Sequence, residues 1–298
     1  MHSLPESSWE WEWETVAGPF SFTEGPVWDG ERVVFTDVPT SRILTFDPRT
    51  GETVVLLDDT EKAVGLALDA DGRLYGCVDG GRRIERYEAD GSRTVVADRF
   101  EGARLNAPND LTIGADGRIW FSDPRYHPDK SVMELDHESV LIAVPDGDGY
   151  LVERATFDTT RPNGVLLSHD ERTLYVAQTH MPPPESCREL RAYPIGDDGN
   201  LGDYEVLFDF GDDRGVDGMT LAPDGSLLAA CGWPKGGRGP RVAVFAPDHT
   251  HVLDIPTVVN PSNLCFGGAT GRDLYLTDSA GCLRRITNLL NEDLSSPW

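Results

Sequence analysis

Short apolar runs alternate with polar turns along most of the chain, which is the pattern of half-buried β-strands. The segment "NDLTIGADGRIWFSDP" (109–124) shows it well: an apolar run, an Asp-Gly turn, and a second apolar run that ends at an Asp. Asp-Gly also stands between two such runs at 71–72 and at 224–225. Because Gly supplies the positive φ of a tight hairpin turn, the pattern predicts antiparallel hairpins and an all-β chain.

The hairpin pattern occurs six times. Its copies begin at Glu24, Val64, Asn109, Asn163, Asp217 and Ser262, so that the starts lie 40, 45, 54, 54 and 45 residues apart. A third strand follows each hairpin, and most copies have a fourth, such as "TVVLLDD" (53–59). Strand repeats at this period are typical of a β-propeller. We therefore predict one domain over 1–298, a six-bladed propeller with four strands per blade.

The sixth repeat lacks a fourth strand, since only a polar tail follows its third strand "CLRRITN" (282–288). At the other end of the chain, "WEWEWETV" (9–16) alternates apolar and acidic residues. We predict that this N-terminal strand completes the last blade and closes the ring, which hides two sheet edges. A sugar-stacking platform built from Trp9, Trp11 and Trp13 is the alternative reading of the same segment.

Composition narrows the classes of function. The 298 residues carry a formal net charge of -25, which disfavours nucleic acid and anionic membranes as partners. The five Cys are odd in number and none has C-x-x-C spacing, so neither a disulfide framework nor a thiolate zinc site is indicated. No signal-peptide pattern and no apolar run of ~18 residues is present. We expect a soluble cytoplasmic protein, a monomer or weak homo-oligomer, that acts on a small molecule.

The first residue of each repeat forms an informative set. Since the first strand of every propeller blade lines the central channel, Glu24, Asn109, Asn163 and Asp217 are expected to converge near the axis. Each of them singly could be a local turn cap. Together they offer two carboxylates and two amide oxygens, and a cation would relieve the repulsion between the carboxylates. Oxygen donors suit a hard divalent ion, Ca²⁺ before Mg²⁺ or Mn²⁺.

The repeats resemble those of the SMP-30/gluconolactonase/LRE-like family over about residues 20 to 288. The resemblance is carried by "EGPVW" (24–28), "NAPNDLTIGADGRIWFSDP" (106–124), "MELDHESV" (133–140), "RPNGVLLSHDERTLYVAQT" (161–179) and "VDGMTLAPDGSLLAACG" (216–232). That family comprises six-bladed propellers, including sugar lactonases and, more distantly, the diisopropyl-fluorophosphatase type.

The resemblance implies a bound divalent cation, with Ca²⁺ favoured and Zn²⁺, Mg²⁺, Mn²⁺ or Fe²⁺ left open. It implies Glu24, Asn163 and Asp217 as metal ligands, and Asn109 as a further ligand or a substrate contact. Family members also carry an Arg-x-Asn that binds substrate, and Arg104 and Asn106 have this spacing. Which of Asn106 and Asn109 faces the site is left open, although the repeat alignment favours Asn109.

The chemistry that this site would perform is hydrolysis. A lactone carbonyl polarised by the ion is attacked by water, and a carboxylate takes the proton of the water. Asp217 is our candidate for both ligand and catalytic base. Asp110 is an alternative base, unless it faces away and bonds to backbone. Tyr126 and His137, together with Arg104, could orient substrate hydroxyls or pack loops.

Three functions compete for this site: a metal-dependent sugar lactonase, a hydrolase of organophosphates or other esters, and a calcium-binding propeller without turnover. The Pro- and charge-rich connectors at 125–139 and 179–190 favour an enzyme, because loops on a rigid ring usually shape a pocket. Neither G-x-S-x-G nor H-E-x-x-H nor a phosphate-binding G-x-x-x-x-G-K-[ST] occurs.

Overall fold

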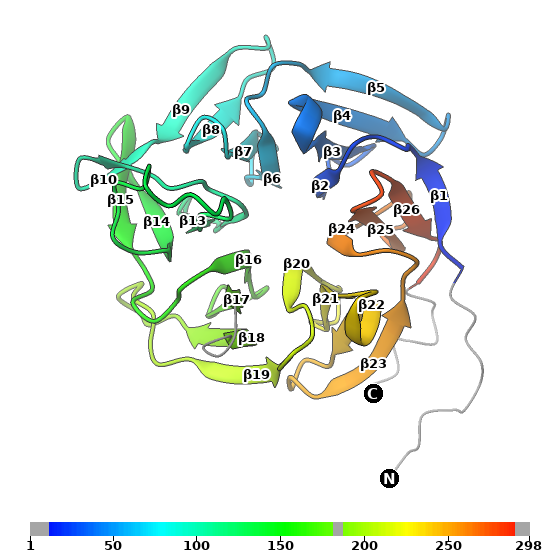
Figure 1. Ribbon diagram of the computed structural model, residues 1–298. Coiled ribbons are helices and arrows are strands. Elements are labelled where there is room, and N and C mark those ends of the chain that lie inside the picture. Colours follow the sequence, from blue (N-terminus) through cyan, green and yellow to red (C-terminus); the bar gives the residue numbers. More distant parts are fainter. Residues whose placement is uncertain (1–11, 181–186, 290–298) are drawn as a thin grey trace.

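The computed structural model describes residues 12–180 and 187–289. Six four-stranded antiparallel sheets surround a central axis, as predicted (Figure 1). In each sheet, the strand that comes first in the repeat is innermost and the chain then runs outward. The helical content of the described residues is a single short 3-10 turn, Val38–Thr40. The alternation of apolar and polar residues thus encodes the all-β architecture directly.

The strands of the first three blades are as follows. Blade 1 comprises β2 (Thr23–Trp28), β3 (Val33–Asp37), β4 (Arg42–Asp47) and β5 (Glu52–Leu57). Blade 2 comprises β6 (Ala63–Leu68), β7 (Leu74–Val78), β8 (Arg83–Tyr87) and β9 (Arg93–Ala97). Blade 3 comprises β12 (Leu111–Ile113), β13 (Ile119–Asp123), β14 (Ser139–Asp146) and β15 (Gly149–Arg154). A two-stranded hairpin, β10 (Arg99–Phe100) and β11 (Ala103–Arg104), lies between blades 2 and 3 in the chain.

The remaining blades repeat this order. Blade 4 comprises β16 (Pro162–Leu167), β17 (Thr173–His180), β18 (Cys187–Pro194) and β19 (Glu205–Asp209). Blade 5 comprises β20 (Val216–Leu221), β21 (Leu227–Trp233), β22 (Gly236–Phe245) and β23 (His251–Pro256). Blade 6 comprises β24 (Pro261–Gly267), β25 (Asp273–Asp278), β26 (Leu283–Ile286) and the N-terminal β1 (Glu14–Ala17).

The ring closes as predicted, because β1 pairs antiparallel with β26 as the outer strand of blade 6. Glu14 lies opposite Arg285, and their side chains form an ion pair at 2.6 Å. Trp13 packs against a core cluster of blades 5 and 6, and its indole N–H donates to the carbonyl of Pro256 at 2.9 Å. Trp13 therefore packs as part of an edge strand. Of the predicted strand at 9–16, residues 9–11, with Trp9 and Trp11, lie outside the described residues, and the observed strand begins at Glu14.

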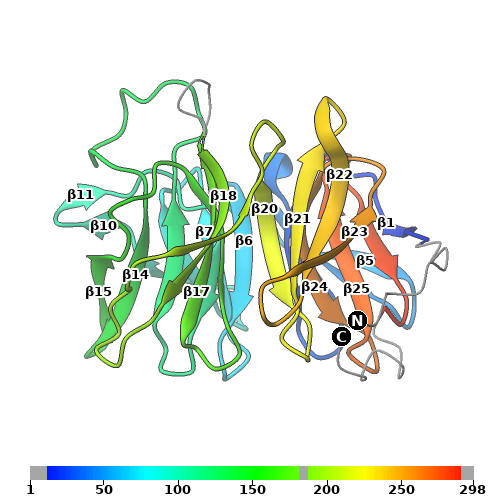
Figure 2. The same ribbon diagram turned by 90° about the horizontal axis from the view of Figure 1, so that it is seen from below.

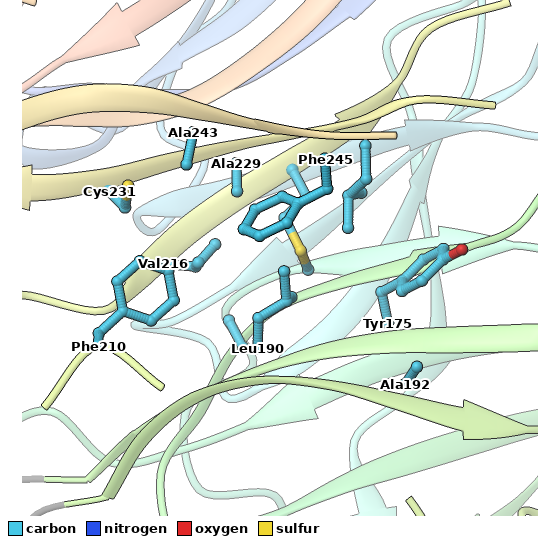
Figure 3. Close-up of a cluster of buried hydrophobic side chains, with 12 residues drawn as sticks. Tyr175, Leu190, Ala192, Phe210, Val216, Ala229, Cys231, Ala243 and Phe245 are labelled. Atoms are coloured by element: carbon cyan, nitrogen blue, oxygen red, sulfur yellow. The ribbon is translucent and has the colours of Figure 1, made fainter. Parts of the chain in front are cut away.

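Apolar side chains between neighbouring blades form the core. The cluster between blades 4 and 5 is typical: Tyr175 and Leu190 of blade 4 meet Val216, Cys231 and Phe245 of blade 5 (Figure 3). All of these side chains are buried. Burial of this kind stabilises by about 25 cal/mol per Å² of apolar surface, so each blade depends on its neighbours and the ring is rigid.

Five of the six inner strands contain a register irregularity near their first residues, at 24–27, 63–66, 162–165, 216–219 and 261–263. Such bulges re-aim side chains. A glycine next to the irregularity lets the blades approach: a Cβ on Gly164 would lie 2.3 Å from the carbonyl oxygen of Asp217 in the next blade. The first residues of the repeats are therefore brought close together at one end of the channel.

The first of the two longer connectors that were predicted to shape a pocket rises from one face of the ring, the upper face in Figure 2. This connector, residues 124–138, joins β13 to β14, whereas most of the second one, predicted at 179–190, lies outside the described residues. The strand β20 begins at this same face. No helix among the described residues has the length and apolarity that a bilayer-spanning helix needs.

Candidate functional site

A cavity of about 380 Å³ opens where the inner strands begin. Five of the six repeat-start residues line it: Glu24, Val64, Asn109, Asn163 and Asp217. The sixth, Ser262, is buried and uses its hydroxyl to bond the carbonyl of Thr23 and the hydroxyl of Thr277. The convergence that the repeat alignment predicts is thus found for the four oxygen-bearing side chains, on the walls of one cavity.

Asn163 and Asp217 form the direct contact of this set. The Nδ2 of Asn163 donates to Oδ1 of Asp217 at 2.6 Å, which joins blade 4 to blade 5 across the cavity. Both side chains are buried, as is Glu24. One carboxylate oxygen of Glu24, Oε2, accepts the backbone N–H of Gly25 at 2.9 Å. Glu24 therefore keeps oxygen capacity for a further partner, and one carboxylate oxygen of Asp217 is occupied by Asn163.

Arg214 supplies the positive charge that faces Asp217. Its Nη2 donates to Oδ2 of Asp217, and its Nη1 donates to the carbonyl of Pro261 at 2.9 Å. Arg214 lines the cavity and its side chain is a quarter exposed. The positive charge next to Oδ2 of Asp217 is therefore the guanidinium of Arg214, a group of the protein itself.

The pKa of Glu24 is raised well above its ordinary value. Burial is the largest cause, and the negative charge of Asp217 is the second. The same two effects act on Asp110, whose pKa rises to about 7. The negative charge of Asp217 thus disfavours the ionisation of both Glu24 and Asp110, and a bound cation would reverse this effect.

Asp110 does not line the cavity. Its Oδ1 accepts the N–H of Leu111 at 3.0 Å, and its Oδ2 accepts the N–H of Val165 in the next blade at 3.3 Å. The side chain of Asp110 therefore bonds to backbone, which is the alternative to a role as catalytic base. Asn109 is different: it lines the cavity, its backbone N–H donates to the carbonyl of Ser122 at 3.0 Å, and its side-chain amide makes no hydrogen bond within the part of the chain that the structure describes.

The donor chemistry fits a hard divalent cation. Two carboxylates and two amides lie on the cavity wall, and amide and carboxylate oxygens are the ligands that Ca²⁺ prefers. No group of three or more His, Cys, Asp or Glu gathers to hold a metal within residues 12–180 and 187–289. A site for an ion here would accordingly use the amides as well as Glu24 and Asp217, as the repeat alignment predicts.

The predicted substrate-binding residues divide into two groups. Tyr126 and Asn109 line the cavity. Arg104, Asn106 and His137 do not line it. The guanidinium of Arg104 bonds the carbonyl of Gly81, and the amide of Asn106 bonds the carbonyls of Asp123 and His137.

The buried position of Asn106 answers the question that the sequence left open. Its side chain is 1% exposed and ties the start of blade 3 to the loop before β14, so Asn109 is the asparagine on the cavity wall. The imidazole of His137 bonds the hydroxyl of Ser139 at 2.9 Å and packs edge-on against Phe100. These contacts are those of loop packing.

Several cavity residues were not identified from the sequence. They include Arg161, Thr179, Arg188, Arg214, Trp233 and Asn260. A signal existed for two of them: Arg161 precedes Asn163 by two residues in the "RPNG" motif, and Arg214 precedes Asp217 by three. Trp233 and Asn260 come from strand ends that no motif marks, so only the folded ring places them here.

The sequence and the fold of this chain are similar to those of known proteins. Residues 22–280 match the model of the SMP-30/gluconolactonase/LRE-like region. A gluconolactonase of Zymomonas mobilis is 28% identical over 301 residues, covering 91% of this chain and 80% of the relative. A solved gluconolactonase structure from Xanthomonas campestris is 34% identical with a TM-score of 0.79, covering 92% of this chain and 88% of that one.

A more distant structure shares the fold alone. It is the calcium-binding protein regucalcin from Agrobacterium tumefaciens, which is 20% identical with a TM-score of 0.72 and covers 92% of each chain.

Proposed function

This chain belongs to the SMP-30/gluconolactonase/LRE-like family, and from that premise we propose that it is a divalent-metal-dependent hydrolase that opens sugar-type lactones. The observation that carries the proposal is the meeting of Glu24, Asn109, Asn163 and Asp217 on one cavity wall. Two relatives of similar length are gluconolactonases, which supports the substrate class.

The proposed metal ligands are Glu24, Asn163 and Asp217, with Asn109 as a fourth ligand or a substrate contact. When bound, a divalent cation would supply Lewis acidity toward the lactone carbonyl and charge stabilisation for the oxygen that becomes negative. Ca²⁺ suits this set of oxygen ligands best, and Mg²⁺, Mn²⁺, Zn²⁺ and Fe²⁺ are the other ions to be tried.

Asp217 is the proposed base. Its Oδ1 is held by Asn163, so Oδ2 is the atom left to accept a proton from water once Arg214 releases it. The water oxygen forms a bond to the carbonyl carbon, the ring C–O bond breaks with its electron pair going to the ring oxygen, and the proton held by Asp217 passes to that oxygen, which leaves as a hydroxyl group while the carboxylate of Asp217 is regenerated. A positioned carboxylate base typically contributes a factor of about 10² to 10⁴ in rate.

The fixed parts of the site contribute positioning. Asn163 orients Asp217 through a hydrogen bond between two blades, and the close approach at Gly164 keeps those blades in contact. The cavity volume of about 380 Å³ lies at the lower end of the range for small-molecule pockets, which suits a monosaccharide lactone.

The test is to measure proton release by pH-stat with a panel of aldonolactones and a phosphotriester. The protein is assayed as metal-loaded, as chelator-treated, and after metal add-back. We expect turnover of at least one lactone that is lost with chelator and restored by Ca²⁺ or another divalent ion. Turnover of the phosphotriester alone would assign the site to the competing ester chemistry. If the metal-loaded protein turns over no substrate, it is the calcium-binding propeller without activity.

A further inference from the structure

The charge of the cavity wall is opposite to that of the molecule. Three arginines and two carboxylates line the cavity, so its side chains carry one net positive charge in a chain whose net charge is -25. A divalent ion at Glu24 and Asp217 would make the cavity more positive still. In so acidic a protein, three of the 26 Lys and Arg residues on the wall of one small cavity call for an explanation.

Two of the three arginines have fixed partners. Arg214 pairs with Asp217 and bonds the carbonyl of Pro261. Arg188 is buried and donates from Nη1 to the carbonyl of Asp213 at 2.7 Å. Both therefore contribute to the architecture of the cavity, and both add to its positive potential.

Arg161 is held differently. Its guanidinium lies over the ring of Tyr126, with Cζ 4.6 Å from the ring centroid. It makes no ion pair with any carboxylate of the described residues, and its Nε is buried without a hydrogen-bond partner among them. A guanidinium stacked on an aromatic ring keeps its planar fork available for an oxyanion.

A second unpaired donor lies on the same wall. The indole Nε1 of Trp233 is buried, and it too lacks a hydrogen-bond partner in the described part of the chain. Buried donors are normally satisfied, since an unmade hydrogen bond costs about 1–3 kcal/mol. The cavity wall thus holds unpaired donors besides its carboxylates, and these donors suit a ligand rich in acceptors.

From these contacts we infer that the substrate is an anionic lactone, whose carboxylate or phosphate group lies remote from the lactone carbonyl and is bound by the guanidinium of Arg161. With the carbonyl end at Glu24, Asn163 and Asp217, the anionic end lies at Arg161 and the indole N–H of Trp233. The inference rests on the proposed lactonase function and narrows its substrate class. Arg161 is a specificity residue in this scheme and takes no part in bond making.

The experiment compares three probes on metal-loaded protein: the neutral D-glucono-1,5-lactone, D-glucaro-1,4-lactone with its carboxylate, and 6-phospho-D-glucono-1,5-lactone with its phosphate. The wild type is expected to have a higher kcat/KM for one anionic probe than for the neutral one, and which probe it is identifies the anion. In Arg161→Gln the ratio of anionic to neutral kcat/KM should fall roughly 10- to 100-fold. Arg161→Lys should give an intermediate ratio, because it keeps the charge without the planar fork.

Arg172→Gln is the matched control. Arg172 lies at the other end of the β16–β17 hairpin, is mostly exposed, and is not part of the cavity. Its substitution should leave the ratio unchanged. Because the ratio compares two substrates on one protein, partial unfolding of a variant cancels from it.

A binding measurement separates this inference from the proposed function. Calorimetric titration of the metal-free protein with D-glucarate should show binding that weakens at least tenfold in Arg161→Gln. If lactones are hydrolysed without preference for an anionic probe, and the ratio is the same in Arg161→Gln, the inference is overturned and the lactonase proposal stands. If no lactone is hydrolysed but glucarate binding depends on Arg161, the lactonase proposal fails and the anion site stands. Glucarate binding that is equally tight in the wild type and in Arg161→Gln would overturn the anion site.

Discussion

Asp213 and Asp217 lie four residues apart at the start of blade 5, and each carboxylate is paired with an arginine. Asp213 and its partner Arg241 are both almost fully buried and lie 2.6 Å apart. Asp213 also accepts the backbone N–H groups of Arg214 and Arg238. The close partners of its carboxylate are donors, and Asp213 is not among the residues that line the cavity.

Asp217 has a contrasting environment. Its partner Arg214 is a quarter exposed on a cavity wall, and the nearby carboxyl of Glu24 opposes it electrostatically. A carboxylate surrounded by donors holds the fold together, whereas a carboxylate that faces another carboxylate is suited to bind a cation. We therefore expect the same residue type, at two positions four residues apart, to serve two purposes that its neighbours decide.

The largest difference between Asp213 and Asp217 is expected in catalytic activity, which Asp217→Asn should lower. Loss of the base should lower kcat about 10³-fold, in line with the usual contribution of a carboxylate base, while the melting temperature changes little. The measurement is pH-stat turnover at saturating metal, with calorimetric melting alongside. Asp197→Asn, at a 97% exposed side chain, is the control. A variant that keeps more than a tenth of the wild-type kcat would remove Asp217 from the role of base.

Asp213→Ala should show the opposite profile. It leaves the buried charge of Arg241 without its closest partner, so the free energy of unfolding should fall by about 3–5 kcal/mol. Urea denaturation measures the loss. The folded fraction should retain its kcat, because Asp213 does not line the cavity. A loss below about 1 kcal/mol would mean that this pair does not stabilise the blade as its burial indicates.

Arg214→Gln tests how the arginine that pairs with Asp217 affects metal binding. We expect divalent metal to bind the variant more tightly, because Arg214 and the metal compete for Oδ2 of Asp217. The gain should be roughly two- to fivefold in Kd, since a partly exposed ion pair contributes at most about 1 kcal/mol. Titration calorimetry of chelator-stripped protein measures it, with Arg172→Gln as control. Weaker binding in Arg214→Gln would show that the arginine helps to form the site.

The smallest effect concerns pH and Glu24. Its pKa in the folded protein is raised, so its contribution to stability is complete below the ordinary value of 4.5 and is lost as pH rises through the higher folded value. Metal-free wild type should therefore lose more stability than Glu24→Gln on going upward from pH 4.5. Urea denaturation with chelator across that range checks this. Parallel pH profiles of the two proteins would contradict it.

The fold could be predicted because it depends on local patterns. Apolar alternation, Asp-Gly turns and a repeat of 40 to 54 residues are readable from the sequence, and each blade repeats them. The repeat also placed Glu24, Asn109, Asn163 and Asp217 in equivalent positions, and equivalent positions of a closed ring must converge. The prediction of a closing N-terminal strand succeeded for the same reason, since the sixth repeat was one strand short.

Loops and ion pairs could not be predicted in this way. Arg104 and Asn106 have the spacing of a substrate motif, yet Asn106 is buried against the loop before β14 and Arg104 bonds the carbonyl of Gly81. Asp110 resembles a catalytic carboxylate in sequence, yet its oxygens accept backbone N–H groups. Spacing alone does not say toward which neighbour a side chain turns.

The sequence by itself determined the ring, its six repeats and the four oxygen-bearing residues at its axis, because a periodic pattern needs no knowledge of distant contacts. Only the tertiary structure decided the charge of the cavity. Arg161 and Arg214 precede the inner strands of blades 4 and 5, Arg188 lies in β18, and they meet because the packed blades bring these positions to one cavity. Convergence of this kind depends on how rigid sheets pack around the axis, and no local pattern records it.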